Sequence, residues 1–165
     1  MLHDADRECP SVERLRLAGA DRPECGSEQH LRVDDFVAVQ DVGKVVHPIL
    51  AAGQIEGGVA QAIGFTLYEN VVWQNGRRIN NQMTNYIIPT AADIPPIRVF
   101  FEEMPYAYGP AGAKGIGELP MDGPAPAILN AIEHATGVAF DHVPLTPEAL
   151  AEKLGESLTG EDDTG

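Results

Sequence analysis

Serine and cysteine are scarce in this sequence of 165 residues. Serine occurs only at positions 11, 27 and 157 and cysteine only at positions 9 and 25, so the stretch 36–154 contains neither. Because nucleophilic hydrolases depend on an activated Ser or Cys side chain, a Ser-His-Asp or Cys-His centre in this stretch is excluded. Two cysteines allow one disulfide at most and are too few to ligate an iron–sulfur cluster. Such low cysteine content makes the cytoplasm the expected location.

Metal-ligand patterns, long apolar runs and an excess of basic residues are also absent. The five histidines form no His-x-x-x-His pair and the cysteines form no Cys-x-x-Cys pair, so no self-contained zinc site is expected. No uncharged apolar run approaches the roughly 18–20 residues of a membrane span, and the first residues do not have the pattern of a signal peptide. The formal net charge of −14 argues against binding to nucleic acid or to anionic lipid.

The composition of the chain and the distribution of its apolar residues indicate one folded unit with two acidic ends. Apolar residues make up 44% of the chain, which is ordinary for a globular domain. Most of the large apolar residues lie between the ends. We therefore predict a poorly ordered amino-terminal segment over 1–32, a folded portion over 33–154, and an acidic flexible tail over 155–165.

The spacing of apolar and turn residues within the folded portion predicts an α+β fold of short strands, one hairpin, two main helices and glycine-rich loops. Strands are expected over 36–43 and 97–102, a hairpin over 71–79 with an Asn75-Gly76 turn, helices over 51–69 and 124–136, and a last short helix from 146 to about 154. The helix over 51–69 is unusual because it contains glycine at 53, 57, 58 and 64. Close packing against a neighbouring element is the favoured explanation, and close approach of a ligand is the alternative.

A second glycine-rich segment spans residues 109–118. It is not a P-loop, since Lys114 follows an alanine and precedes a glycine. It offers a run of backbone amides and one carboxylate, Glu118, which together suit an anionic cofactor and acid–base chemistry. On spacing alone, a surface loop with a solvated glutamate explains the segment slightly better.

Five sequence blocks in a fixed order carry a family resemblance. They are Gly53-Gln54-Ile55-Glu56-Gly57-Gly58, Tyr86-x-x-Pro89-Thr90-x-x-Asp93-x-Pro95, Gly112-Ala113-Lys114-Gly115-Ile116-Gly117-Glu118, Pro124-Ala125-Pro126-Ala127-Ile128-x-x-Ala131-Ile132 and Leu145-Thr146-Pro147-Glu148. This set resembles the carboxy-terminal part of the molybdenum-binding large subunit of the xanthine dehydrogenase/aldehyde oxidase family of molybdenum hydroxylases. The resemblance runs from about 33 to 154, and it outweighs the surface-loop explanation of Glu118.

The resemblance implies roles for individual residues. Glu118 occupies the position of the general base, which takes a proton during hydroxylation of an electron-poor carbon with water as the oxygen source. Gln54 lies on the molybdopterin side of the site, and the backbone of Lys114, Gly115, Ile116 and Gly117 packs beside the cofactor. Glu56 is expected to be structural. A carboxylate on a partly desolvated glycine-rich loop is suited to proton abstraction near neutral pH.

The resemblance also implies that this sequence lacks domains that complete family members contain. Family members are several times longer, and the molybdenum–molybdopterin cofactor lies between domains, so its shell is shared with domains that this sequence lacks. The expected partners are the remaining molybdenum-binding domains or subunit, an iron–sulfur subunit carrying 2Fe-2S, an FAD subunit, and a small-molecule substrate that is an N-heterocycle or an aldehyde. Residues 1–30 carry none of the blocks, and read as an alternative start or a frameshift remnant. Two hypotheses stay open: a subunit or fragment of a molybdenum hydroxylase, and a non-catalytic remnant of a split gene that acts at most as an interaction module.

Overall fold

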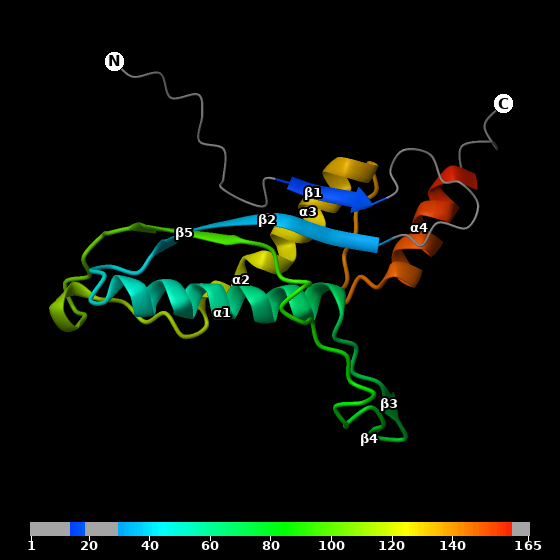
Figure 1. Cartoon of the computed structure of the whole chain (residues 1–165), viewed down its shortest axis with the longest axis horizontal. Helices are drawn as coiled ribbons and strands as arrows, with labels where there is room; N and C mark the ends of the chain where they lie inside the picture. Colours follow the sequence, from blue (N-terminus) through cyan, green and yellow to red (C-terminus); the bar gives the residue numbers. More distant parts are fainter. Residues whose placement is uncertain (1–13, 19–29, 160–165) are drawn as a thin grey trace, which may run out of the picture.

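The computed structural model describes residues 14–18 and 30–159. It has the expected α+β architecture, with a three-stranded sheet packed on helices and a separate two-stranded hairpin (Figure 1). In chain order the elements are β1 (Arg14–Ala18), β2 (His30–Asp41), α1 (Pro48–Leu67), β3 (Trp73–Gln74), β4 (Arg77–Arg78), β5 (Ile97–Glu102), a 3-10 turn (Pro110–Gly112), α2 (Leu119–Asp122), α3 (Pro124–Thr136) and α4 (Pro147–Thr159).

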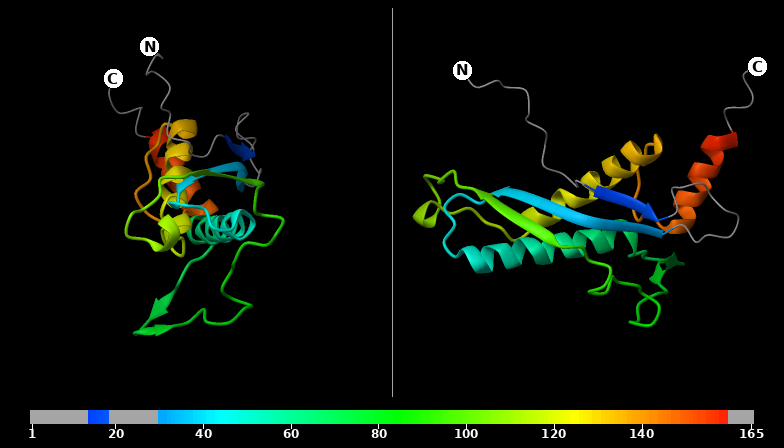
Figure 2. Two further views of the ribbon diagram at one scale, coloured as in Figure 1. Left: turned by 90° about the vertical axis from the view of Figure 1, so that its left-hand side faces the viewer. Right: turned by 45° about the horizontal axis from the view of Figure 1, so that its top comes forward.

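Strand β2 organises the sheet by pairing with a different neighbour along each half. Its first half pairs antiparallel with β1, from Ala18 opposite His30 to Arg14 opposite Asp35. Its second half pairs parallel with β5, from Phe36 opposite Ile97 onward. A parallel pair needs a crossover connection, and that connection includes α1, which lies beneath the sheet (Figures 1 and 2). The carboxyl ends of β2 and β5 therefore meet at the same edge.

The core lies where β2 meets helices α1, α3 and α4. Its fully buried members include Ile55 and Ile63 of α1, Ile128 and Ile132 of α3, and Leu150 of α4. Because these helices come from distant parts of the sequence, the core fixes α1 against the carboxy-terminal half of the chain.

Most predicted elements are present, two of them with the predicted boundaries and others with shifted ones. The strand over 97–102 and the helix over 124–136 are confirmed as β5 and α3. Asn75 and Gly76 have positive φ angles of 49° and 75°, as a type I′ hairpin turn requires. Helix α4 continues to Thr159, beyond the predicted end near 154. Strand β1 lies inside the segment 1–32, for which no strand was predicted.

No helix in the described part of the chain is long and apolar enough to cross a membrane. The same part contains no cluster of three or more His, Cys, Asp or Glu side chains that could hold a metal ion. Cys9 and Cys25 lie outside the described residues.

Candidate functional site

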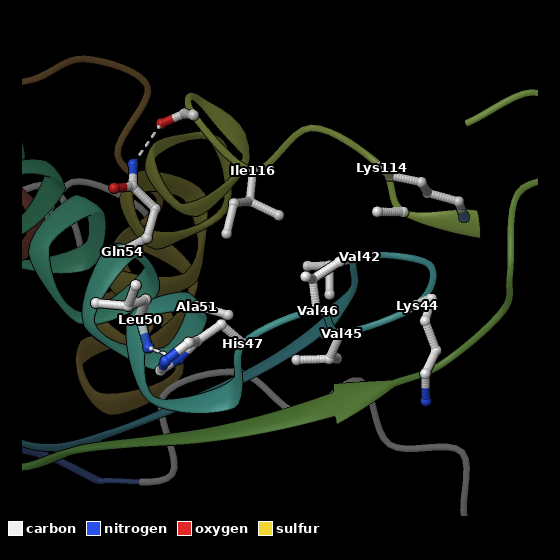
Figure 3. A pocket seen from close by; sticks show the side chains of 12 residues that line it. Val42, Lys44, Val45, Val46, His47, Leu50, Ala51, Gln54, Lys114 and Ile116 are labelled. Carbon is white, nitrogen blue, oxygen red and sulfur yellow. Dashed lines mark hydrogen bonds between the residues drawn. The ribbon is translucent and has the colours of Figure 1, made fainter. Parts of the chain in front are cut away.

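A cleft of about 430 Å³ opens beside the carboxyl end of β2 and the first turns of α1. Three segments line it: the turn after β2, the start of α1, and the glycine-rich segment. Its lining residues are Val42, Lys44, Val45, Val46, His47, Leu50, Ala51, Gln54, Ala113, Lys114, Ile116 and Gly117. Figure 3 shows the apolar side chains of Val42, Val46 and Ile116 between Gln54 and Leu50 at one end and the two lysines at the other. The outer edge of a parallel strand pair at its carboxyl ends is a usual place for ligands in sheets of this kind.

Helix α1 starts three residues before its predicted first residue, because two residues define its amino end. Pro48 occupies the first helical turn, where its missing N–H costs nothing. His47 caps the helix, since its Nδ1 accepts a hydrogen bond from the backbone N of Leu50 at 3.3 Å. Histidine is an uncommon cap, so the sequence pattern did not reveal this start. The cap places His47 and Leu50 in the lining of the cleft.

The glycine-rich segment is attached to the turn after β2 by backbone hydrogen bonds. The N–H of Lys114 donates to the carbonyl of Val42, and the N–H of Lys44 donates to the carbonyl of Gly112, both at 2.9 Å. Gly43, with φ of +66°, makes this contact possible, because a Cβ atom there would lie 2.4 Å from the carbonyl oxygen of Gly112. The turn and the segment therefore form one rigid wall.

Two ion pairs reinforce this wall. The Nζ atom of Lys114 contacts a carboxylate oxygen of Asp41, whose other oxygen accepts the N–H of Gly43 at 2.9 Å. The hydrogen bond from Lys114, together with that from Gly43, lowers the pKa of Asp41. Lys44 pairs with Glu103 at 2.6 Å and thereby lowers the pKa of Glu103. Because each lysine already has a carboxylate partner, the cleft does not present two free cations.

Gln54 links α1 to the glycine-rich segment on the other side of the cleft. Its Nε2 donates to the carbonyl oxygen of Gly117 at 3.2 Å, and Glu118 follows directly (Figure 3). Within the described part of the chain, the backbone amides of Gly115, Ile116 and Gly117 donate to no protein acceptor. They are available to an anionic or polar ligand.

The structure brings four of the six predicted site residues into the cleft lining, namely Gln54, Lys114, Ile116 and Gly117. Gly115 lies in the same segment and is exposed. Glu118 does not line the cleft. Its side chain is exposed at the amino end of α2, which it does not cap with a side-chain hydrogen bond. In this chain alone the carboxylate is thus solvated, contrary to the partly desolvated loop that we expected.

The glycines of α1 divide into two groups, and close packing explains one of them. A Cβ atom at Gly58 would lie 2.3 Å from Cγ of Pro120, and one at Gly64 would lie 2.8 Å from Cδ of Pro89, so these glycines allow close packing. At Gly53 and Gly57 an added Cβ would meet nothing within 4 Å. Packing among the described residues therefore does not explain Gly53 and Gly57, and they leave open space on the outer face of α1.

The sequence of this chain matches a protein family, and its structure matches a solved structure. Residues 27–95 match the family of molybdopterin cofactor-binding domains. The chain superposes on quinoline 2-oxidoreductase from Pseudomonas putida 86 with a TM-score of 0.74 and 39% sequence identity, over 79% of this chain and 17% of that one.

Two relatives with similar sequences are molybdenum-binding subunits. The xanthine dehydrogenase molybdenum-binding subunit of Escherichia coli O157:H7 is 36% identical over 124 residues, which are 74% of this chain and 16% of that subunit. The aldehyde oxidoreductase molybdenum-binding subunit of Escherichia coli K12 is 34% identical over 127 residues, 75% of this chain and 17% of that subunit. Over about three quarters of its length, this chain is therefore similar to the molybdenum-binding subunits of xanthine dehydrogenases and aldehyde oxidoreductases, and it spans about a sixth of the length of these relatives.

Proposed function

We propose that this chain is the carboxy-terminal portion of a molybdenum hydroxylase large subunit and that it supplies one wall of the molybdopterin site together with the general base, Glu118. The observation that carries the proposal is the hydrogen bond from Gln54 to Gly117. It joins the two glycine-containing blocks across one cleft, directly beside Glu118. The remaining wall would come from the parts of such a subunit that this chain does not span.

The cleft has features that fit a bulky cofactor with anionic groups. Gly53 and Gly57 leave space beside α1, and the amides of Gly115, Ile116 and Gly117 lack protein acceptors. We assign these three residues, with Gln54 and the backbone of Lys114, to the cofactor wall. Apolar lining with a few fixed polar groups is typical of cofactor sites. When bound, the molybdenum–molybdopterin group supplies the redox centre for hydroxylation.

Glu118 would take up the proton that is released when oxygen from water is delivered to the substrate carbon. Its position suits this role in two ways. It lies at a boundary between a loop and a helix, with no side-chain hydrogen bond fixing it as a cap. It also follows Gly117, whose carbonyl is held by Gln54. In the assembled subunit, coverage by the remaining domains would remove water from around this carboxylate and make it a better base.

The proposal extends to substrate and partners. Relatives of this chain are named for quinoline, xanthine and aldehyde oxidation. We therefore propose an N-heterocycle or an aldehyde as the substrate class. Electrons would leave through 2Fe-2S and FAD groups on separate iron–sulfur and FAD subunits, in a cytoplasmic complex.

One observation favours the second hypothesis, a non-catalytic remnant. The carboxylate of Glu118, the proposed base, is exposed to solvent in the described part of the chain. Without the remaining domains, neither the cofactor nor the substrate could be enclosed.

The proposal is tested by replacing Glu118 with Gln in the complex purified from its source cell. Loss of a general base should lower turnover about 10²–10⁴-fold while the molybdenum content stays unchanged. Glu133→Gln on the exposed surface of α3 is the matched control and should leave turnover intact. A loss of no more than a few-fold for Glu118→Gln would reject the base assignment. Purification of the native chain as a free monomer without molybdenum would favour the remnant.

A further inference from the structure

A second cavity, of about 270 Å³, opens at the end of α1 that lies next to α4 (Figure 1). Segments that are distant in the sequence meet there: the start of β2, the end of α1, the stretch before β5 and the stretch that leads into α4. The cavity shares no residue with the cleft. Along α1 the cleft lining ends at Gln54 and the cavity lining begins at Leu67, about 20 Å further on.

Three leucines form an apolar floor for this cavity. Leu145 is fully buried, while Leu67 is 5% and Leu31 is 8% exposed. All three belong to the hydrophobic core, so their positions are fixed by packing on the inner side. The floor can therefore receive the apolar part of a small molecule without rearrangement.

Two hydrogen-bond donors, Tyr68 and Arg32, also line the cavity. Within the described part of the chain, the Tyr68 hydroxyl has no hydrogen-bond partner. Burial, together with the carboxylate of Asp93, raises the pKa of Tyr68, so the phenol stays protonated and can donate. The Nε atom of Arg32 lies 3.6 Å from a carboxylate oxygen of Asp34. A guanidinium has five N–H groups, so this one ion pair leaves donors for a ligand.

Asp93 supplies the negative charge of the cavity. One of its oxygens accepts hydrogen bonds from the hydroxyl and the backbone N–H of Thr90, both at 2.7 Å. These bonds lower the pKa of Asp93, so it is a carboxylate at neutral pH. Its other oxygen accepts no hydrogen bond from the described residues. The carboxyl end of α1 adds negative potential beside it, because the last turn of the helix contains no basic residue.

The combination of groups selects the charge of the ligand. Asp93 and Arg32 both influence the pKa of Tyr68, and Arg32 also lowers that of Asp93, so the three groups lie within electrostatic reach of one another. A singly charged ligand would pair with one of the two charged side chains and be repelled by the other. A zwitterion satisfies both, and its carboxylate can accept from the phenol as well.

We propose that this cavity binds a free α-amino acid with an aliphatic side chain. The ammonium group pairs with Asp93, and the carboxylate pairs with Arg32 and the hydroxyl of Tyr68. The aliphatic side chain lies on the leucine floor. Neither molybdopterin nor Glu118 takes part in this binding, so the site is a further ligand site of the chain.

The proposal is tested by titrating the full chain with L-leucine and with three probes that each lack one of its groups. N-acetyl-L-leucine lacks the ammonium group, 3-methylbutylamine lacks the carboxylate, and glycine lacks the side chain. By calorimetry we expect L-leucine to bind with a Kd of about 1 mM or below, and each of the other probes about tenfold or more weakly. In NMR spectra L-leucine should shift the methyl signals of Leu31, Leu67 and Leu145, but not those of Leu50 in the cleft.

Two pairs of variants place the binding in this cavity. Ala92→Trp fills the cavity from its exposed rim and should abolish binding, whereas Ala91→Trp, at an exposed neighbour outside the lining, should leave it intact. Arg32→Gln removes the cation and should weaken L-leucine about tenfold, whereas Arg77→Gln on β4 removes an equally exposed cation elsewhere and should change nothing. Circular dichroism of each variant confirms that the fold is retained.

Several results would overturn the proposal. They are an absence of saturable binding up to about 10 mM L-leucine, equal affinities for L-leucine and N-acetyl-L-leucine, binding that survives Ala92→Trp, and methyl shifts confined to the cleft. Because the cavity and the cleft share no residue, these results leave the proposed function untouched. Turnover that is independent of Glu118 would reject the base assignment and leave the amino-acid site standing.

Discussion

Gln54 and Gly117 are 63 residues apart in the sequence, and the side chain of the first donates a hydrogen bond to the backbone carbonyl of the second at 3.2 Å. The glutamine lies near the start of α1, and the glycine lies one residue before Glu118. Since both partners are exposed, this bond contributes little to global stability. Its consequence is positional, because it ties the residue that precedes Glu118 to a helix anchored in the core.

Replacing Gln54 with Glu should free the segment around Glu118 without unfolding the protein. The carboxylate has no N–H to donate and would face the carbonyl oxygen of Gly117. We expect backbone amide exchange at 115–118 to rise several-fold, and the free energy of unfolding to change by no more than about 0.5 kcal/mol. Gln61→Glu, on the exposed side of the same helix two turns later, is the control and should leave the exchange unchanged. Equal exchange rates in Gln54→Glu and the native protein would contradict the positional role.

The two groups of glycines in α1 predict opposite effects of the same substitution at adjacent positions. Gly58→Ala would force a Cβ atom to within 2.3 Å of Pro120 and should lower the free energy of unfolding by about 1–3 kcal/mol. Gly57→Ala meets nothing within 4 Å and should raise it by up to about 1 kcal/mol, through helix propensity alone. Urea denaturation of the two variants checks the pair. A loss of stability in Gly57→Ala would show that this position packs against something in the isolated chain.

The pairing of Asp41 with Lys114 predicts an acid-sensitive attachment of the glycine-rich segment. The hydrogen bond from Lys114 lowers the pKa of Asp41 below its ordinary value of about 3.9. The contribution to stability is therefore present above about pH 4 and is lost as the pH falls through the folded-state pKa. We expect an NMR titration of the Asp41 carboxyl to show a midpoint below about 3.9, and Lys114→Met to move that midpoint upward. An unchanged midpoint in Lys114→Met would mean that the ion pair does not persist in solution.

Local patterns in the sequence revealed most elements, because those elements depend on local chemistry. The hairpin follows from Asn75-Gly76, and the end of α3 follows from Gly137, whose φ of 74° ends the helix in the left-handed conformation. Short α2 was not among the predicted elements. Pro120 lies in its first turn, where proline is tolerated.

The composition of the cleft was only partly predictable, for a tertiary reason. Gln54 and the glycine-rich segment could be recognised as blocks, whereas Val42, Lys44 and His47 join them only because β2 and β5 are parallel and end together. The residues of the turn after a strand do not show that the strand pairs in parallel with another one. The one available signal was Gly43, whose positive φ permits contact with Gly112.

Removing the hydroxyl of Tyr86 should loosen residues 70–92, which carry the β3–β4 hairpin and which we call the arm, while retaining the aromatic contact of Tyr86. Tyr86→Phe keeps the ring beneath Arg78 but removes the hydrogen bond to Glu69, which should increase protease cleavage within 70–92. Tyr106→Phe, at an exposed tyrosine outside the arm, is the matched control and should leave cleavage unchanged.

The hydrogen bond from Tyr86 to Glu69 also makes the attachment of the arm sensitive to alkaline pH. The hydrogen bond to the Glu69 carboxylate raises the pKa of Tyr86 above its ordinary value of about 10. Because the raised pKa favours the protonated phenol in the folded protein, the stabilisation is complete below about pH 10 and is lost as the pH rises through the folded-state pKa. Protease cleavage of the arm in the native protein should therefore increase above about pH 10, relative to cleavage elsewhere in the chain. In Tyr86→Phe it should be high at both neutral and alkaline pH. Identical pH profiles for the native protein and Tyr86→Phe would show that another contact holds the arm.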